Sequence, residues 1–398
     1  CPEVVVSPGL INAHDHLTYQ SPPYVPTSDE RWEHRHDWRQ GQNNHTNIQI
    51  GGSASTDARI WAELRQVMAG TTSLNGSGNA PGLMRNLDQS SHLLGLDIDP
   101  VLYETFPLGS SDQLIASCNY QVAGPDAPTG AFTPHVAEGI EESARNELRC
   151  LYGTPTSPGY GDLSRTAVIH AVGASASEAA WLATGGASVV WSPRTNVSLY
   201  GDTAPVPVFH RLGVNVGMGT DWLYSGSMNM LRELQCADSL NQNQWGKALT
   251  DEDLWRIATV GGADALKVGH RIGRLKTGHV ADLALFTLRS FAGNPHRAVI
   301  TAGPSDVVLT VRGGKTLYGD ANLTAALRGG CAALDVCGSA KEVCLEGESI
   351  TKTFAQLQTA QASAYGLFAC GTPVNEPTCV PSRTSTNASW PASTFGSS

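Results

Sequence analysis

The stretch Pro8-Gly-Leu-Ile-Asn-Ala-His14-Asp-His16 follows an apolar run, Val4-Val5-Val6, near the start of the chain. If residues 4–12 form a buried strand, the alternation of side chains places His14 and His16 on the same side of its end. Two imidazoles at this spacing can hold one divalent metal ion. Because the chain has 12 histidines, a His-x-His pair is weak evidence when it stands alone. The rest of the chain has to supply the partners of this pair.

Composition narrows the class of protein. The chain has 398 residues, 41% hydrophobic residues and 42 glycines, which is typical of an ordinary globular protein with one large or several smaller domains. The net charge is −10 and no basic block occurs, so we expect no nucleic-acid partner. No apolar run reaches the roughly 18 residues of a membrane-spanning helix. The chain begins at Cys1 without an initiator Met, from which we expect that upstream sequence has been removed.

The nine cysteines are concentrated near the end of the chain. Spacings of five and six residues between the first three in the tail differ from the Cys-x-x-Cys of a zinc knuckle. A disulfide-stapled tail is favoured over reduced structural cysteines, and the odd total leaves at least one thiol unpaired or paired outside the chain. We therefore expect a periplasmic or extracellular protein. The tail cysteines are Cys331, Cys337, Cys344, Cys370 and Cys379.

Strand-like apolar runs alternate with helical segments over the first two thirds of the chain. This rhythm predicts βαβ units with a parallel sheet, and a closed, distorted (β/α)8 TIM barrel over residues 1–268 accommodates them better than an open sheet. The predicted helices cover 59–68 and 175–183, and the predicted strands cover 166–170, 187–191 and 214–218.

The pattern changes after residue 268. Strands at 280–286, 306–312 and 315–318, with a Gly313-Gly314 turn, predict a small β-sandwich domain over 269–322. Residues 323–398 form a Cys-containing C-terminal extension. From about residue 371 it becomes rich in Pro, Ser and Thr, so we expect its end to be loosely ordered.

Four further residues are candidates for the chemistry. His135 and Glu138, three residues apart, offer a ligand and a proton carrier, although a surface His-Glu pair fits the same pattern. His170 ends an apolar strand, where a hydrogen-bonded core histidine is the alternative to a site residue. Asp221 follows the strand at 214–218 and suits a ligand or base, or equally a helix N-cap.

Together, in this order, these points resemble the amidohydrolase superfamily, and within it the cytosine deaminase and triazine chlorohydrolase branch. The resemblance covers about residues 5–320 and leaves the tail outside. The residues that carry it are the stretch from Pro8 to His16, His135-Val-Ala-Glu138, His170, Ser192-Pro-Arg-Thr-Asn196, Gly219-Thr-Asp221 and Ala281-Asp282-Leu.

The resemblance implies one divalent metal ion, zinc with iron as the alternative, held by His14, His16, His135 and Asp221. In such a site the ion lowers the pKa of water from about 15.7 toward 7 and so provides hydroxide at neutral pH. The resemblance further implies that Asp221 takes the proton of the water and that His170 orients the hydroxide or stabilises the developing charge. Glu138 would pass a proton to the ring nitrogen or the leaving group.

Lysine usage bears on the number of metal ions. Many members of the superfamily use two ions bridged by a carboxylated lysine on the fourth strand. The first lysine here is Lys247, whereas the fourth strand must fall between about residues 100 and 134. The sequence therefore indicates a site for a single ion.

Three features depart from the family pattern. The β-domain of the family usually uses both chain ends, yet no N-terminal strand is expected before Cys1. Trp191 precedes Ser192-Pro-Arg at a position where a polar residue or His is common in the family. Trp191 and Trp222 would form an aromatic mouth for a planar or apolar substrate beside Asn196, although buried packing explains either tryptophan equally well. The charged insert from Arg31 to Arg39, which includes His36, is a candidate substrate-recognition lid or a solvated loop with internal salt bridges.

The leading hypothesis is a metal-dependent hydrolase that acts on non-peptide C–N bonds of a small-molecule substrate, with deamination of a heterocyclic amine as the expected reaction. Hydrolysis of a cyclic or aryl amide by the same site is the close alternative. A catalytically inactive binding protein with the same barrel is a distant one. The sequence leaves open whether the chain forms a homo-oligomer.

Overall fold

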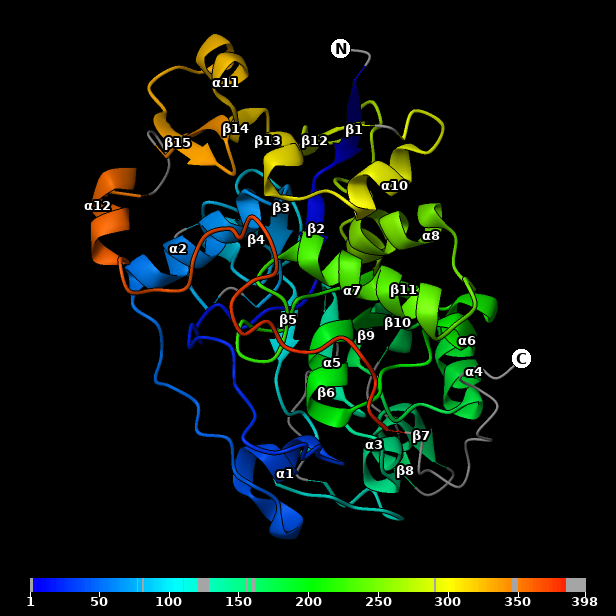
Figure 1. The fold of residues 1–398 in the computed structure, drawn as a ribbon. Coiled ribbons are helices and arrows are strands. Elements are labelled where there is room, and N and C mark those ends of the chain that lie inside the picture. The colour runs from blue at the N-terminus through cyan, green and yellow to red at the C-terminus, as the bar shows by residue number, and fades with distance from the viewer. Residues whose placement is uncertain are drawn as a thin grey trace.

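The computed structural model describes residues 3–76, 78–80, 82–109, 111–120, 129–154, 157–158, 162–289, 291–345 and 350–383. Parallel strands covered by helices form one part of the molecule, and an antiparallel sheet lies at one end (Figure 1). The α/β class expected from the sequence is confirmed. Within the described residues, no helix is long and apolar enough to cross a membrane.

Eight parallel strands carry the polar residues of interest. They fall into a three-stranded and a five-stranded sheet. Backbone hydrogen bonds join the two sheets at both ends: Ala13 N donates to Met218 O (2.8 Å), and Val101 N donates to Leu87 O (2.8 Å). The strands are β2 (Leu10–Asn12), β3 (Thr71–Leu74) and β4 (Arg85–Asn86), then β5 (Leu102–Glu104), β6 (Phe132–Val136), β9 (Ala167–His170), β10 (Ser188–Trp191) and β11 (Asn215–Met218).

Helices pack outside these strands, and several of them begin where the sequence offers a cap or a proline. Ser175 caps α4 in a capping box with Glu178, and Pro193 opens α5. The α-helices are α1 (Arg35–Gln40), α2 (Thr56–Val67), α3 (Glu142–Tyr152), α4 (Ala176–Gly185), α5 (Pro193–Tyr200), α6 (Val206–Arg211), α7 (Met230–Asn243), α8 (Asp251–Arg256), α9 (Gly262–Ala265), α10 (Pro295–Ile300), α11 (Ala321–Leu327) and α12 (Phe354–Ala360).

The apolar run at the N-terminus forms two strands instead of one. β1 (Val4–Pro8) pairs antiparallel with β12 (Leu283–Thr287), whereas β2 pairs parallel with β3. The chain changes sheets at Gly9, where a Cβ atom would come within 2.2 Å of the Thr72 side chain. The close approach of the backbone to Thr72 requires glycine at this position.

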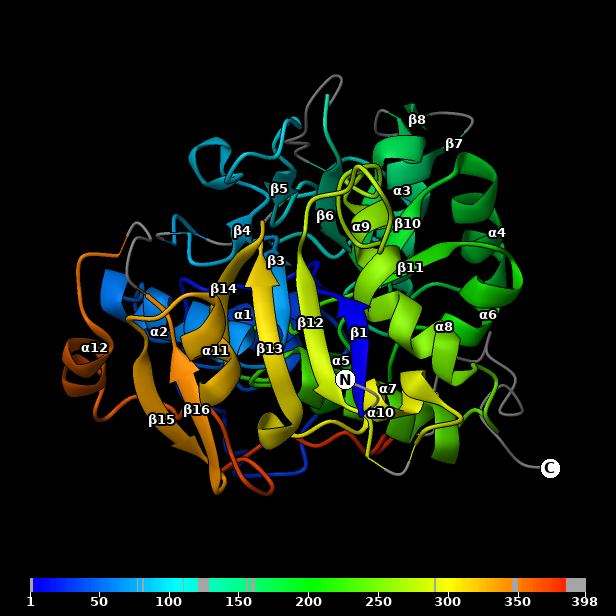
Figure 2. The ribbon, with the colours of Figure 1, turned by 90° about the horizontal axis from the view of Figure 1, so that it is seen from above.

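The antiparallel sheet therefore corrects two expectations (Figure 2). An N-terminal strand does belong to it, because β1 forms its edge. The tail contributes as well, since β15 and β16 extend the sheet beyond the expected limit at residue 322. The strand order is β1, β12, β13 (Val307–Arg312), β14 (Lys315–Asp320), β16 (Ser339–Val343) and β15 (Ala332–Val336). A two-stranded ribbon, β7 (Gly153–Thr154) and β8 (Ser157–Pro158), follows α3.

Four disulfide bonds confirm the expectation that cysteines staple the tail. Two of them lie within the tail, one joins the tail to α7, and one joins Cys118 to α3. Residues 371–383, expected to be loose, pack against the helices instead, while 384–398 and Cys1 lie outside the described residues. The pairs are Cys118–Cys150, Cys236–Cys379, Cys331–Cys344 and Cys337–Cys370.

Candidate metal centre and active site

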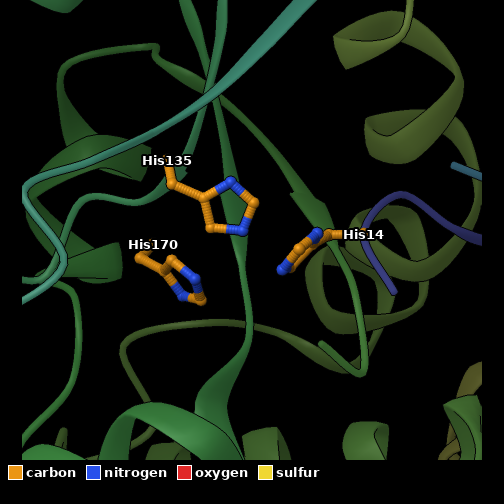
Figure 3. Close-up of side chains that lie close together, drawn as sticks. All are labelled: His14, His135 and His170. Carbon is orange, nitrogen blue, oxygen red and sulfur yellow. The ribbon is translucent and has the colours of Figure 1, made fainter. Parts of the chain in front are cut away.

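Four histidines and one aspartate gather at the carboxyl ends of the parallel strands. His14 and His16 follow β2, His135 lies in β6, His170 ends β9, and Asp221 follows β11. The His14 ring lies 4.6 Å from the His135 ring and 5.3 Å from the His170 ring, centre to centre. Figure 3 shows these three imidazoles pointing toward a common space. Residues far apart in sequence thus meet on the strand face where parallel barrels build their active sites.

Two overlapping groups of these residues could hold a metal ion. One group is His14, His135 and His170, and the other is His14, His16 and Asp221; in each, the ligand atoms lie within 4.8 Å of one another. His14 belongs to both groups. The expected set of His14, His16, His135 and Asp221 is therefore drawn from both, and the geometry offers His170 as a ligand in addition to its expected orienting role.

The chemistry of these donors fits a divalent ion. His135 Nε2 is buried and has no hydrogen-bond partner among the described residues. Burial lowers the pKa of His16 to about 4 and that of His170 to about 3, so both imidazoles are neutral at neutral pH, as metal ligands must be. Burial opposes ionisation of Asp221, but the neighbouring His14 holds the pKa of the carboxyl well below its usual range. Imidazole nitrogens with one carboxylate suit zinc or iron.

The backbone is strained at three of the strand ends. The φ angles are +75° at His170, +63° at Asp221 and +55° at Ala137, in the left-handed region that residues with a side chain rarely adopt. Such strain persists where the surrounding structure holds it and is concentrated at functional sites. His170 and Asp221 belong to the group of candidate ligands, and Ala137 directly precedes Glu138.

Glu138 lies beside the histidines and is buried. It accepts a hydrogen bond from the Tyr200 hydroxyl (2.7 Å), and its Oε1 lies 3.7 Å from His170 Nε2. Burial raises the pKa of Glu138 to about 8, although the charge of Arg35 acts in the opposite direction. The carboxyl group therefore carries a proton at neutral pH and suits a general acid.

Helix α5 positions the partners of two of these residues. Asn196 Nδ2 lies 3.1 Å from His170 Nδ1, and Tyr200, one turn further along the same helix, bonds Glu138. Because residues four apart share one face of a helix, a single helix orients both side chains.

A cavity of about 400 Å³ opens onto this group. Trp222, one of the four expected substrate-binding residues, lines it. Its other apolar and aromatic walls are Tyr19, Trp38, Ile50 and Phe106, and Arg39 and Thr105 supply polar groups beside the candidate catalytic residues.

The other three expected substrate residues lie elsewhere. Trp191 is fully buried because β10 directs its side chain outward, under the helices. Its Nε1 donates to Thr203 Oγ1 (2.7 Å). His36 is buried behind Arg39, with its Nδ1 2.9 Å from Arg39 Nη1. Asn196 contacts His170 rather than the cavity. The expectation of an aromatic mouth is thus wrong for Trp191.

Sequence reasoning missed several residues of the site. The Tyr103 hydroxyl lies 3.0 Å from His16 Nδ1, and the Arg39 guanidinium lies 3.8 Å from the centre of the Phe106 ring. Arg39 ends the charged insert, so its position carried a signal. Tyr103 and Phe106 lie in a segment with no recognisable pattern, and nothing in the sequence distinguishes them.

A buried ion pair holds the insert against the rest of the site. Arg35 donates to both carboxylate oxygens of Glu147 (2.7 and 2.5 Å), and Ala137 N donates to the same carboxylate (2.8 Å). The pair therefore joins the insert to the backbone beside Glu138. The alternative of a solvated loop is wrong for this part of the insert, since Arg35 is fully buried.

Replacing Glu147 by glutamine is expected to lower the free energy of unfolding by about 3 kcal/mol, because it leaves the buried Arg35 without its counter-charge. Burial opposes ionisation of Glu147, but Arg35 outweighs it and lowers the pKa from 4.5 to about 2. The stability that this pair adds is present above pH 4.5 and is lost as the pH falls through about 2. Urea unfolding between pH 3 and 7 should show that the free energy of unfolding of the Glu147→Gln variant falls less steeply with decreasing pH than that of the parent protein. The same pH dependence in both proteins would contradict the assignment.

Comparison with known proteins agrees with this geometry. Residues 133–317, from β6 to β14, match the model of the Amidohydrolase family. Over this stretch the chain is similar to the Amidohydrolase family. The matched range contains His135, Glu138, His170 and Asp221, and the strand ends that carry them.

Individual relatives match parts of the chain. A 5-methylthioadenosine/S-adenosylhomocysteine deaminase of Pyrococcus furiosus is 34% identical over 189 residues, which are 46% of this chain and 43% of that protein. The match thus spans less than half of the length of this relative.

Two solved structures share the fold at low sequence identity. An adenosine deaminase from Xanthomonas campestris with bound zinc has a TM-score of 0.54 and 19% identity, covering 91% of this chain and 85% of that one. The atrazine chlorohydrolase of Arthrobacter aurescens, complexed with zinc, has a TM-score of 0.51 and 20% identity, covering 79% and 84%.

Proposed function

We propose that this protein is a metal-dependent hydrolase that deaminates a heterocyclic amine. The observation that carries the proposal is the group of four histidines and Asp221 beside a protonated Glu138, at the base of a cavity with aromatic walls. The deaminase names of the relatives support it. The cavity volume of about 400 Å³ suits a small-molecule substrate.

His14, His16, His135 and Asp221 would hold one divalent ion, zinc or iron, with His170 as the further possible ligand. When bound, such an ion acts as a Lewis acid and makes water nucleophilic at neutral pH. The superfamily match and the zinc in related structures support this choice of cofactor.

Four side chains of the site would transfer protons, stabilise charge and bind the substrate. Asp221, which is anionic before the reaction, accepts a proton from the attacking water. Protonated Glu138 donates a proton to the ring nitrogen or to the departing amino group. His170, held by Asn196, donates a hydrogen bond to the developing charge. The ring of Trp222 provides a flat wall against which a planar heterocycle can stack.

We also propose a barrel architecture and a cellular location for the protein. The hydrogen bonds at both sheet ends support a closed, distorted (β/α)8 barrel, with the six-stranded antiparallel sheet in place of the small β-sandwich. The domain limit at residue 268 stays a prediction, whereas the expected limit at residue 322 cuts through this sheet. Four disulfide bonds support a periplasmic or extracellular location. A homo-oligomer stays a prediction.

Ammonia release from a panel of aminopurines, aminopyrimidines, pterins and cyclic amidines tests the proposal, with lactams added to detect ring opening. We expect ammonia from at least one aminated heterocycle. Ring opening without ammonia would replace the deaminase by the cyclic amide hydrolase. No turnover of any compound by the metal-loaded protein would favour a binding protein.

The metal content of a His14→Ala variant tests the ion separately. His14 belongs to both candidate ligand groups, so we expect the variant to lose the bound zinc that elemental analysis finds in the parent protein. His210→Ala, on the exposed end of α6, serves as the control and should keep the zinc. Equal zinc content in both variants would contradict the assigned site.

A further inference from the structure

A segment of the C-terminal extension runs along helix α5. Residues 376–383, here called the strap, lie beyond the part of the chain that matches the family. Figure 1 shows the end of the red chain passing across α5. Since α5 carries Asn196 and Tyr200, whatever holds this helix also holds the partners of His170 and Glu138.

The strap holds the N-terminal end of α5 through Arg194. The guanidinium of this buried arginine lies 3.4 Å from Glu376 Oε2, and its Nη1 donates to Pro377 O (2.5 Å). Glu376 also pairs with Arg232 on α7 (Nε to Oε1, 2.7 Å). The side chain of Glu376 is only 6% exposed, so little water competes for it. A buried, paired carboxylate is a firm point of attachment because separating it would leave uncompensated charges.

The strap holds the C-terminal end of α5 as well. Gly201, the C-cap of the helix, accepts hydrogen bonds from Ser382 N (3.0 Å) and Arg383 N (3.3 Å). Arg383 forms an ion pair with Glu33. The Glu33 carbonyl accepts from Ile140 N (2.8 Å), so this contact reaches the backbone two residues from Glu138.

A disulfide bond anchors the middle of the strap. Cys379 is bonded to Cys236 on α7, and this bridge joins positions 143 residues apart in the chain. The strap is therefore attached covalently to the helix that packs beside α5, and by hydrogen bonds to both ends of α5.

We propose that the strap is a positioning element of the active site: it fixes α5 so that Asn196 stays on His170 and Tyr200 stays on Glu138. Glu376, Cys379 and Arg383 are its positioning residues. None of them lines the cavity, so the strap acts through α5 and not on the substrate. The catalytic consequence rests on the proposed function, whereas the effect on α5 does not.

A Cys236→Ala/Cys379→Ala double variant tests the proposal, with Cys331→Ala/Cys344→Ala as the matched control. The control removes a tail disulfide beside β15 and β16, in the antiparallel sheet. Loss of an outer partner of a site residue typically costs 10- to 100-fold in activity. We expect the strap variant to lose kcat about tenfold, with KM and bound zinc nearly unchanged, while the control keeps kcat within about twofold.

Hydrogen exchange gives a readout that needs no substrate. We expect the amides of α5 to exchange faster in the strap variant than in the control, and those of β14 to be unaffected. Glu376→Gln, which keeps the disulfide, should show the same pattern and replaces the double variant if that one does not fold. Unchanged exchange in α5, or equal losses of kcat in strap and control variants, would overturn the proposal. Absence of ammonia release by the parent protein would overturn the proposed function alone.

Discussion

An Asp221→Asn variant is expected to lose kcat/KM by a factor on the order of 10³ to 10⁴. Asp221 Oδ1 lies 3.0 Å from His14 Nε2 and 3.4 Å from His16 Nε2, so one carboxylate contacts two candidate ligands. An amide of the same shape cannot accept the proton of the attacking water and removes one negative charge from the buried site. The variant should therefore lose both the proton acceptor and affinity for zinc. Steady-state ammonia release and elemental analysis measure the two effects.

The fold of this variant should survive. Asp221 has a φ angle of +63°, and asparagine accepts this conformation about as well as aspartate. Thermal unfolding should therefore give similar midpoints for the metal-free forms. Asp238→Asn, an ion-pair partner of Arg297 outside the cavity, is the matched control and should keep full activity. An Asp221→Asn variant with more than a tenth of the parent activity would show that Asp221 is not the proton acceptor.

A Glu138→Gln variant is expected to lose kcat by a factor on the order of 10² to 10³, with zinc content unchanged. Glutamine keeps an oxygen that can accept the Tyr200 hydrogen bond, so the packing around it is preserved. It cannot deliver the proton that the carboxyl group carries at neutral pH. Ammonia release under saturating substrate measures the loss.

A Tyr200→Phe variant distinguishes two contributions to kcat: the proton that Glu138 donates, and the hydrogen bond from Tyr200 that orients Glu138. Phenylalanine fills the same buried space and removes the hydroxyl, which donates to Glu138 and accepts a hydrogen bond from Trp38 Nε1 (2.9 Å). We expect a loss of kcat of about tenfold, smaller than that of Glu138→Gln. Equal losses in the two variants would mean that orientation of Glu138 matters more than its proton. A fully active Glu138→Gln variant would contradict its role as general acid.

Local sequence pattern was sufficient to locate four of the eight parallel strands, β2, β9, β10 and β11, and the polar residues that follow or end them. The expected strand at 166–170 is β9 (Ala167–His170), and the one at 187–191 is β10 (Ser188–Trp191). Such segments are predictable because their apolar runs are short, buried and bounded by glycine or polar residues. The same reasoning failed at Gly9, where the chain leaves one sheet for another, because both halves of that run are equally apolar.

Side-chain direction was less predictable than strand position. Trp191 and Trp222 each lie at the end of a strand or just beyond it, yet Trp191 packs under the helices and Trp222 lines the cavity. The two faces of a strand inside a parallel sheet are both buried, so hydrophobicity does not distinguish them.

The ligand pattern of the site is a local property of the chain. His14 and His16 follow the end of β2 two residues apart, and a carboxylate or imidazole at the carboxyl end of a parallel strand lies on the face where such folds build their sites. The partners of these residues are a different matter. Tyr200 on Glu138, Asn196 on His170 and the strap across α5 join segments that are distant in sequence, and their contacts depend on how helices pack and where a disulfide closes. No period or motif encodes such contacts, so they became visible only in the folded chain.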